Sequence, residues 1–153
     1  MKLARKMESE MVNVKDLELI DAWSKIDPSR QVRFQFPIFS QTGAKSTAVV
    51  YFEVEPGKHL GMHTDSAEEV AFIVAGRGEG IIGDQRSMLE PGSFALIPAM
   101  VPHDVINNGK ETLRVVGFFS SSTIVSVFED AFAPIGKHVL GTPLPSEPDA
   151  AAA

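Results

Sequence analysis

The chain has 153 residues, of which 44% are hydrophobic and 22% are charged, and this is the size and composition of one globular domain with a sizeable core. Its formal net charge of −6 argues against a nucleic-acid partner, and the lack of cysteine excludes disulfides, thiolate catalysis and cysteine-ligated metals. No apolar run approaches the roughly 20 residues of a membrane span, and no apolar signal core follows Met1. We therefore expect a cytoplasmic protein without a membrane partner.

Residues 1–30 are expected to form an N-terminal segment that contains one short helix. Leu17, Ile20 and Trp23 recur at helical spacing, which predicts a helix over residues 16–27. The proline that follows would end the helix, because proline lacks an amide hydrogen and clashes with the preceding turn.

From residue 31 onward the pattern changes to short β-type segments separated by turns rich in glycine and proline. This pattern is typical of an all-β sandwich or barrel, and we expect a single barrel domain over residues 31–139. The expected strands are residues 31–39, 46–55, 69–75, 78–82, 86–89, 93–97, 103–107, 112–119 and 123–129. Residues 140–153 contain three prolines and end in alanines, so we expect a loose C-terminal tail.

Four side chains in two short stretches form a candidate metal site. His63 and Asp65 are two residues apart, so their side chains point the same way in an extended chain. Glu69 begins a later strand, and His103 would join them if its strand ran beside that of His63. Imidazoles and carboxylates bind iron, manganese, nickel, copper or zinc, and two histidines with one carboxylate form the facial arrangement of non-haem Fe(II) oxygenases. Asp65 would be a fourth ligand or would orient a histidine through a hydrogen bond.

The two stretches resemble the paired motifs of the cupin superfamily. The first motif, G-x5-H-x-H-x3,4-E-x6-G, is matched except at its second histidine, and the second, G-x5-P-x-G-x2-H-x3-N, is matched except at its second glycine. The matching residues are Gly57, His63, Glu69 and Gly76 in the first motif and Gly92, Pro98, His103 and Asn107 in the second. The resemblance spans roughly residues 46–119. It implies a small antiparallel jelly-roll barrel that holds a metal ion and commonly assembles as a dimer.

Two positions depart from the family pattern. Asp65 stands where a histidine is usual, whereas family members usually hold the metal with three histidines and one glutamate. The added carboxylate makes the site harder and more negative, which favours Fe(II), with Mn, Ni or Zn as alternatives, and disfavours copper. A site that has lost its metal is the other interpretation. Met100 stands at a glycine position, so we expect a different turn there or a side chain that narrows the pocket mouth.

The resemblance implies a mononuclear metal-dependent enzyme that acts on a small organic molecule inside the barrel. Its metal ligands would be His63, Glu69 and His103, with Asp65 as an optional fourth. The ligand types favour a dioxygenase. With a non-redox ion we expect an isomerase, decarboxylase or lyase, for which an unligated Asp65 is the candidate catalytic base. A non-catalytic cupin that binds a small ligand is the third alternative, and in each case we expect a homodimer formed through an edge strand or the N-terminal segment.

Other side chains have simpler expectations. His59 shares the strand parity of His63 but is expected to be a pocket or surface residue, and Glu68 is expected to face outward. The phenylalanines of the strands are expected mostly in the core. At most one of Phe118 and Phe119 would face the cavity, because neighbouring residues of a strand point to opposite faces.

Overall fold

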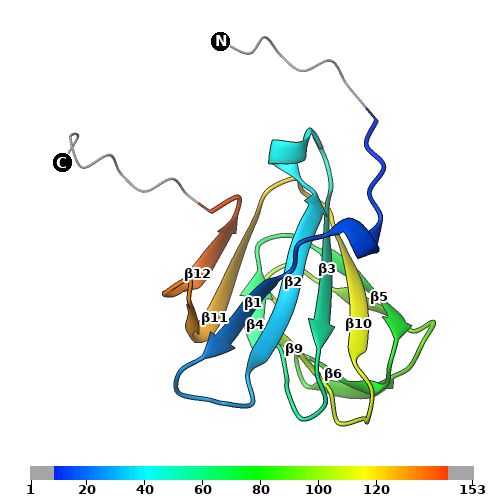
Figure 1. The fold of residues 1–153 in the computed structure, drawn as a ribbon, viewed down its shortest axis with the longest axis vertical. Coiled ribbons are helices and arrows are strands. Elements are labelled where there is room, and N and C mark those ends of the chain that lie inside the picture. Colours follow the sequence, from blue (N-terminus) through cyan, green and yellow to red (C-terminus); the bar gives the residue numbers. More distant parts are fainter. Residues whose placement is uncertain (1–8, 145–153) are drawn as a thin grey trace, which may run out of the picture.

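Twelve β-strands account for almost all regular structure in residues 9–144, the part of the chain that the computed structural model describes (Figure 1). The strands are β1 (Ile20–Ser24), β2 (Gln31–Ile38), β3 (Ala48–Val54), β4 (His63–Asp65), β5 (Glu69–Ala75), β6 (Gly78–Ile82), β7 (Gln85–Leu89), β8 (Phe94–Ile97), β9 (His103–Ile106), β10 (Leu113–Phe119), β11 (Ile124–Ala133) and β12 (Lys137–Thr142). Two short 3₁₀ helices, η1 (Val14–Asp16) and η2 (Ser40–Thr42), complete the elements. Within the described residues, no helix is long and apolar enough to cross a membrane.

The strands pair antiparallel in one sheet that curls around the core. Their order is β7-β6-β9-β4-β11-β1-β2-β3-β10-β5-β8, and β12 joins β11. In Figure 1, strands β1, β2, β3 and β10 lie in front of β4, β9 and β6. Neighbours that are far apart in sequence, such as β4 with β11 and β5 with β10, are typical of a jelly roll. The predicted all-β antiparallel barrel is therefore confirmed.

Buried and more exposed residues alternate along the inner strands, as an antiparallel sheet with one covered face requires. In β10 this alternation turns Phe119 into the core and leaves Phe118 46% exposed, so only one of them faces inward, as expected. The expectation that strand phenylalanines are mostly core is wrong for Phe118 and for Phe94 of β8, which is 74% exposed. Both side chains lie on the outer face of the sheet.

The helix expected over residues 16–27 is wrong, because this segment contains the end of η1 and the strand β1. Strand β1 pairs with β2 on one side and with β11 on the other. Its buried residues, Ala22 and Ser24, alternate as in a strand, whereas Ile20 and Trp23 are 40% and 41% exposed. Pairing on both sides satisfies the backbone hydrogen bonds of this segment. These bonds stabilise the strand more than three apolar side chains at helical spacing would favour a helix.

The C-terminal tail was expected to begin at residue 140, but strand β12 continues to Thr142. This strand pairs with β11, with Ile124 opposite Thr142 and Phe132 opposite Lys137. The predicted domain boundary therefore falls inside a strand that belongs to the sheet. Residues 145–153 of the expected tail lie outside the described residues, as do residues 1–8 of the N-terminal segment.

Candidate metal centre

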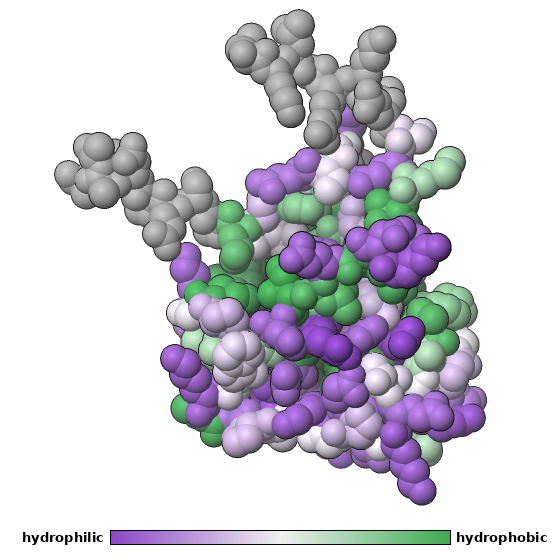
Figure 2. All heavy atoms as spheres, in the orientation of Figure 1, coloured by the Kyte–Doolittle hydropathy of each residue, from purple (hydrophilic) through white to green (hydrophobic). Residues whose placement is uncertain are grey.

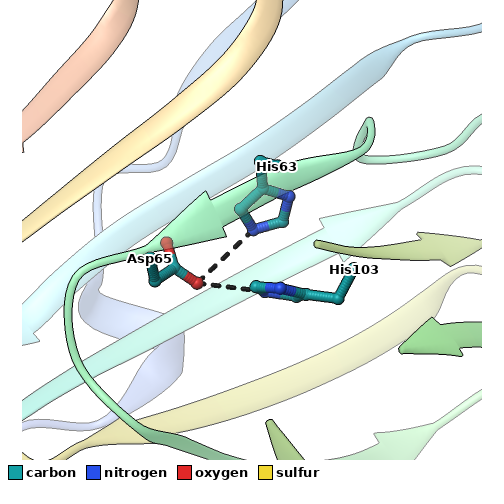
Figure 3. Close-up of side chains that lie close together, drawn as sticks. All are labelled: His63, Asp65 and His103. Atoms are coloured by element: carbon teal, nitrogen blue, oxygen red, sulfur yellow. Dashed lines mark ion pairs between the residues drawn. The ribbon is translucent and has the colours of Figure 1, made fainter. Parts of the chain in front are cut away.

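Strands β4 and β9 bring His63 and His103 side by side inside the barrel (Figure 3). The two residues are partners across these strands, so the expected pairing is confirmed. Their rings are buried, with centroids 4.1 Å apart. The ring of His63 also stacks on Phe128 of β11 at 4.4 Å, which fixes its orientation.

The backbone sets the tautomer of both neutral imidazoles. His63 Nδ1 lies 2.7 Å from the carbonyl oxygen of Gly61, and His103 Nδ1 lies 2.9 Å from that of Val101. A carbonyl oxygen can only accept, so Nδ1 is the donating nitrogen in each ring. When the ring is neutral, its Nε2 therefore carries the lone pair, which is the arrangement of a histidine that binds a metal.

Asp65, also on β4, points toward both imidazoles (Figure 3). Its Oδ2 lies 3.0 Å from His103 Nε2 and 3.6 Å from His63 Nε2. Its Oδ1 accepts a 2.5 Å hydrogen bond from Ser126 Oγ, which lies opposite Asp65 across the β4–β11 pair. One potential ligand atom from each of His63, Asp65 and His103 can be chosen so that all lie within 4.8 Å of one another. Ser126 therefore orients the carboxylate and leaves Oδ2 for the cluster.

Two atoms of this cluster have unused bonding capacity. Asp65 Oδ2 and His103 Nε2 are buried 3.0 Å from each other, and neither has a hydrogen-bond partner when His103 is neutral. Buried polar atoms are rarely left in this state. Ligand atoms of His63, Asp65 and His103 lie within 4.8 Å of one another, so one ion could be held by all three residues. The cluster is therefore compatible with one divalent metal ion bound by nitrogen and oxygen.

Glu69 reaches the same interior from β5, on the opposite wall. Its Oε1 lies 3.6 Å from His103 Nε2, but the cluster of potential ligands contains only His63, Asp65 and His103. Its Oε2 lies against Gly117 of β10, where a Cβ would collide with it. A glycine within a strand often marks such a close approach. All four predicted site residues thus face one interior, with Asp65 at the centre of the cluster and Glu69 beside it.

The two buried carboxyl groups have pKa values that move in opposite directions. Burial opposes ionisation of Asp65, but the nearby His103 and His63 outweigh it and hold the pKa of this carboxyl well below its ordinary range. Burial raises the pKa of Glu69, and His103 offsets only part of that effect. Burial also disfavours a charged His103, yet Asp65 and Glu69 outweigh it and raise the pKa of His103 to about 10. In the metal-free protein, a proton on His103 therefore offsets negative charge in the cluster.

Asp104 of β9 connects the two segments that carry the histidines. Its Oδ1 accepts hydrogen bonds of 2.8 and 2.7 Å from the amides of Gly61 and Val105. Its Oδ2 lies 2.8 Å from His59 Nδ1. Because the Gly61 carbonyl in turn holds His63, Asp104 positions the first histidine relative to the second. His59 belongs to this outer network and does not line the cavity.

The motif positions that are not ligands shape the surrounding turns. Met100 has a φ of 65°, so it adopts the left-handed conformation that glycine adopts more easily. Its amide donates a 2.8 Å hydrogen bond to the Asp65 carbonyl, and its side chain is exposed and outside the cavity wall. The expected narrowing of the pocket mouth by Met100 is therefore wrong. Asn107 is buried, and its side chain makes three hydrogen bonds to nearby backbone groups.

The cluster lies in the wall of an interior cavity of about 410 Å³. This volume is within the range of about 300–1,000 Å³ that is typical of small-molecule sites. The wall away from the cluster is mostly aromatic and aliphatic. Residues from the start of β1, the end of β2, η2 and the end of β12 also contribute to the lining, so the cavity extends from the metal cluster toward that end of the barrel.

Sequence reasoning missed three residues that hold the site together: Ser126, Gly117 and Asp104. The first two lie on β11 and β10, outside both motifs. Gly117 could have been noticed in the sequence, because an isolated glycine inside a strand pattern suggests a close approach of another group. Nothing in the sequence marked Ser126 or Asp104, since polar residues are common in strands with one exposed face.

The comparisons with known proteins agree with this geometry. The family model of the cupin domain matches residues 50–119, a segment that contains all four candidate site residues. No curated protein matches the chain. The matched segment, the barrel fold and its similarity to a solved cupin domain support the assignment of the chain to the cupin superfamily.

Several solved structures share the fold. A cupin-2 domain protein from Rhodospirillum rubrum is 23% identical, with a TM-score of 0.62 over 76% of this chain and 77% of that one. The polyketide cyclase RemF from Streptomyces resistomycificus is 20% identical, with a TM-score of 0.60 over 73% of this chain and 79% of that one. An oxalate decarboxylase from Lactobacillus farciminis is 18% identical, with a TM-score of 0.62 over 72% of this chain but 33% of that one. At these identities the similarity concerns the fold alone.

Proposed function

We propose that the chain is a mononuclear metal-dependent enzyme that acts on a small organic molecule inside the barrel. The observation that carries this proposal is the buried cluster of two imidazoles and two carboxylates beside a cavity of about 410 Å³, in which Asp65 Oδ2 and His103 Nε2 have no hydrogen-bond partner when His103 is neutral. A bound ion would satisfy both atoms and face the cavity. Burying two imidazoles and two carboxylates around one interior is costly, and a core that served stability alone would not need it.

In this proposal His63, Asp65 and His103 bind the ion, and Glu69 is a fourth ligand or a proton carrier. The ion would supply oxygen activation if it is Fe(II), or polarise a carbonyl or carboxylate if it is Mn, Ni or Zn. Ser126 keeps Asp65 oriented, and the apolar wall limits access of water to the reacting end. Glu69 can keep its proton to a higher pH than an ordinary glutamate, because burial raises its pKa.

The reaction class has two candidates. The ligand set favours a dioxygenase with Fe(II). An isomerase, decarboxylase or lyase with a non-redox ion gains support from the fold shared with a polyketide cyclase and an oxalate decarboxylase. For the second class, Glu69 suits acid–base chemistry better than Asp65, since the low pKa of Asp65 makes it a weak base. A non-catalytic cupin that binds a small ligand remains the alternative.

Metal analysis of protein purified without added ions tests the proposed site. We expect one equivalent of a divalent metal in the wild type and its loss in His103→Ala. The matched control is His138→Ala, because His138 is exposed and its Nδ1 lies 3.2 Å from the Phe128 carbonyl oxygen, outside the cluster, so the metal content of this variant should stay unchanged. A His103→Ala variant that keeps the full metal content would contradict the site.

The redox and non-redox candidates differ in oxygen use. Iron-loaded protein should take up oxygen with a diketone, catechol or thiol substrate if it is a dioxygenase. Turnover of a carbonyl substrate without oxygen uptake, and with manganese, nickel or zinc in the site, would favour the second class. Metal binding with no turnover under either condition would favour the binding cupin.

We also propose that two copies of the chain associate through the outer face of β5, β8 and β10. This face carries seven apolar side chains, of which Phe94 and Leu96 of the edge strand β8 are 74% and 60% exposed. The seven are Val70, Phe72, Val74, Phe94, Leu96, Val116 and Phe118. A second copy would cover this apolar surface and could extend the sheet at β8.

Sedimentation tests the association. The wild type is expected to be a dimer, and Phe94→Glu is expected to shift it to a monomer. Met88→Glu is the matched control, because Met88 is a similarly exposed apolar residue on β7, the strand at the other edge of the sheet. A wild-type monomer at high concentration would rule out the dimer, and dissociation by Met88→Glu alone would move the interface to β7.

A further inference from the structure

Away from the metal cluster, the cavity is an aromatic pocket. Seven phenylalanines contribute to its wall, together with aliphatic side chains. These phenylalanines are Phe34, Phe36, Phe39, Phe52, Phe119, Phe128 and Phe132. Figure 2 shows apolar side chains gathered across the middle of the molecular face, with hydrophilic residues above and below them. Such a wall gives a ligand apolar contact but few hydrogen bonds.

The described lining residues include no lysine or arginine, and their only carboxylates are Asp65 and Glu69. Arg30 is a buried cation close to the wall, but it lies over the ring of Phe132, 4.0 Å from the centroid, and its guanidinium is ion-paired with Asp130 at 2.8 Å. Its charge is therefore neutralised behind an aromatic ring. Apart from the ion proposed for the cluster, whose charge Asp65 already offsets in part, an anion would meet no cation among the described lining residues, and burying an incompletely paired anion is costly.

Outside the cluster, the described lining has four polar side chains: Gln35 and Ser126 are engaged, and Gln41 of η2 and Thr142 of β12 lie toward the other end of the cavity. Gln35 donates through Nε2 to the Glu18 carbonyl and accepts through Oε1 from the Phe36 amide. Ser126 donates to Asp65. The body of the cavity, between the histidine cluster and that other end, therefore offers a bound molecule few polar contacts.

We propose that this cavity takes an uncharged aromatic molecule that carries a pair of oxygen donors, such as an aryl diketone, and excludes small dianions. The oxygen donors would face His63, Asp65 and His103, and the ring would pack among the phenylalanines. The pair of oxygen donors rests on the proposed function, because it requires a metal ion in the cluster. The preference for an uncharged aromatic group rests independently on the aromatic wall and on the lack of a lysine or arginine in the described lining.

Three compounds with the same spacing of oxygen donors test the substrate class. Malonate is a small dianion, 2,4-pentanedione is small and neutral, and 1-phenyl-1,3-butanedione is neutral and aromatic. Calorimetric titration into zinc-loaded protein should give the tightest binding for the phenyl compound, at least tenfold over pentanedione, with malonate weakest. The inference would be overturned if malonate bound as tightly as the phenyl compound. It would also be overturned if the phenyl compound bound no more tightly than 2,4-pentanedione.

A matched pair of variants tests the missing countercharge. Leu140 of β12 lines the cavity, whereas its neighbour Val139 is 44% exposed and does not. Leu140→Lys should strengthen malonate binding and weaken binding of the phenyl compound, each at least severalfold. Val139→Lys should change neither. If both variants bind malonate as the wild type does, lack of a cation is not what excludes anions.

The same titrations separate this inference from the proposed function. If the protein never retains a metal but still binds the phenyl compound, the aromatic pocket is supported and the metal-dependent enzyme is rejected. Metal-loaded protein that prefers malonate would keep the metal site and reject the aromatic substrate class.

Discussion

Asp65 and Glu69 approach the same interior from opposite walls of the barrel, and the two walls affect a buried carboxylate differently. The side chains are about equally inaccessible, since Asp65 is 3% and Glu69 is 5% exposed. Asp65 lies between two imidazoles and accepts from Ser126, and its pKa is lowered. Glu69 lies against Gly117, and burial raises its pKa. The neighbouring groups, and not the degree of burial, therefore decide which carboxylate is ready to bind a cation.

Neutralising each carboxylate in turn is the strongest test of this difference. Asp65→Asn should weaken metal binding by more than about 100-fold, because it removes the charge at the centre of the cluster. Glu69→Gln should weaken binding by about tenfold or less, since Glu69 contacts the cluster only at its edge. Equilibrium dialysis measures both affinities. A larger loss in Glu69→Gln would reverse the order of the two ligands.

The pH dependence should have opposite signs for metal affinity and for metal-free stability. A metal ion must displace the proton of His103, whose pKa is raised from 6.5 to about 10, so affinity should rise about tenfold per pH unit between pH 7 and 9. Metal-free stability should fall over the same interval, because the stabilising proton is fully present below pH 6.5 and is lost as the pH approaches 10. Asp65 stays ionised throughout and adds no pH dependence. Calorimetry and denaturant unfolding at each pH measure the two slopes, and flat profiles would contradict the coupling.

Gly117→Ala tests the wall that carries Glu69. The added methyl group would collide with Glu69 Oε2 and, less severely, with Val50 Cγ1, so we expect a loss of about 1–3 kcal/mol in the free energy of unfolding. The matched control is Gly80→Ala, because a Cβ there would meet Leu89 only at an ordinary contact distance of 3.4 Å. Equal stability of the two variants would mean that Glu69 can move away without cost.

Ser126→Ala tests the wall that carries Asp65. It removes the 2.5 Å hydrogen bond to Oδ1 and should weaken metal affinity by about tenfold, a typical effect for a group that orients a ligand. Ser126→Thr keeps the hydroxyl group and should retain most of the affinity. The same loss in both variants would point to packing as the cause.

The smallest expected effect concerns the turn that contacts the Asp65 backbone. Met100→Gly relieves the left-handed conformation of a bulky residue, and we expect a gain of up to about 1 kcal/mol in the free energy of unfolding, since glycine also adds freedom to the unfolded chain. Thermal unfolding would measure it. A loss of stability would show that the exposed methionine side chain contributes more than the strain costs.

Much of the barrel could be predicted from the chain alone. The strands at residues 69–75 and 78–82 were predicted with their observed bounds, because turn residues with restricted or unusual backbone conformations border them. The N-terminal segment was misjudged as a helix, because three apolar residues at helical spacing give little information about a five-residue strand. Strand β12 was missed for a related reason, since none of its residues is fully buried and they show no alternation of burial.

The sequence by itself, through the spacing of its two motifs, predicted that His63, Asp65, Glu69 and His103 approach one point, and the structure places all four at one interior with the strands of the two histidines paired. Only the tertiary structure decided which carboxylate lies at the centre of the cluster, and that β10 and β11 supply Gly117 and Ser126 around it. The reason is that spacing fixes the direction of a side chain along its own strand. What that side chain meets depends on cross-strand register and on the curl of the sheet, which arise from contacts between distant segments.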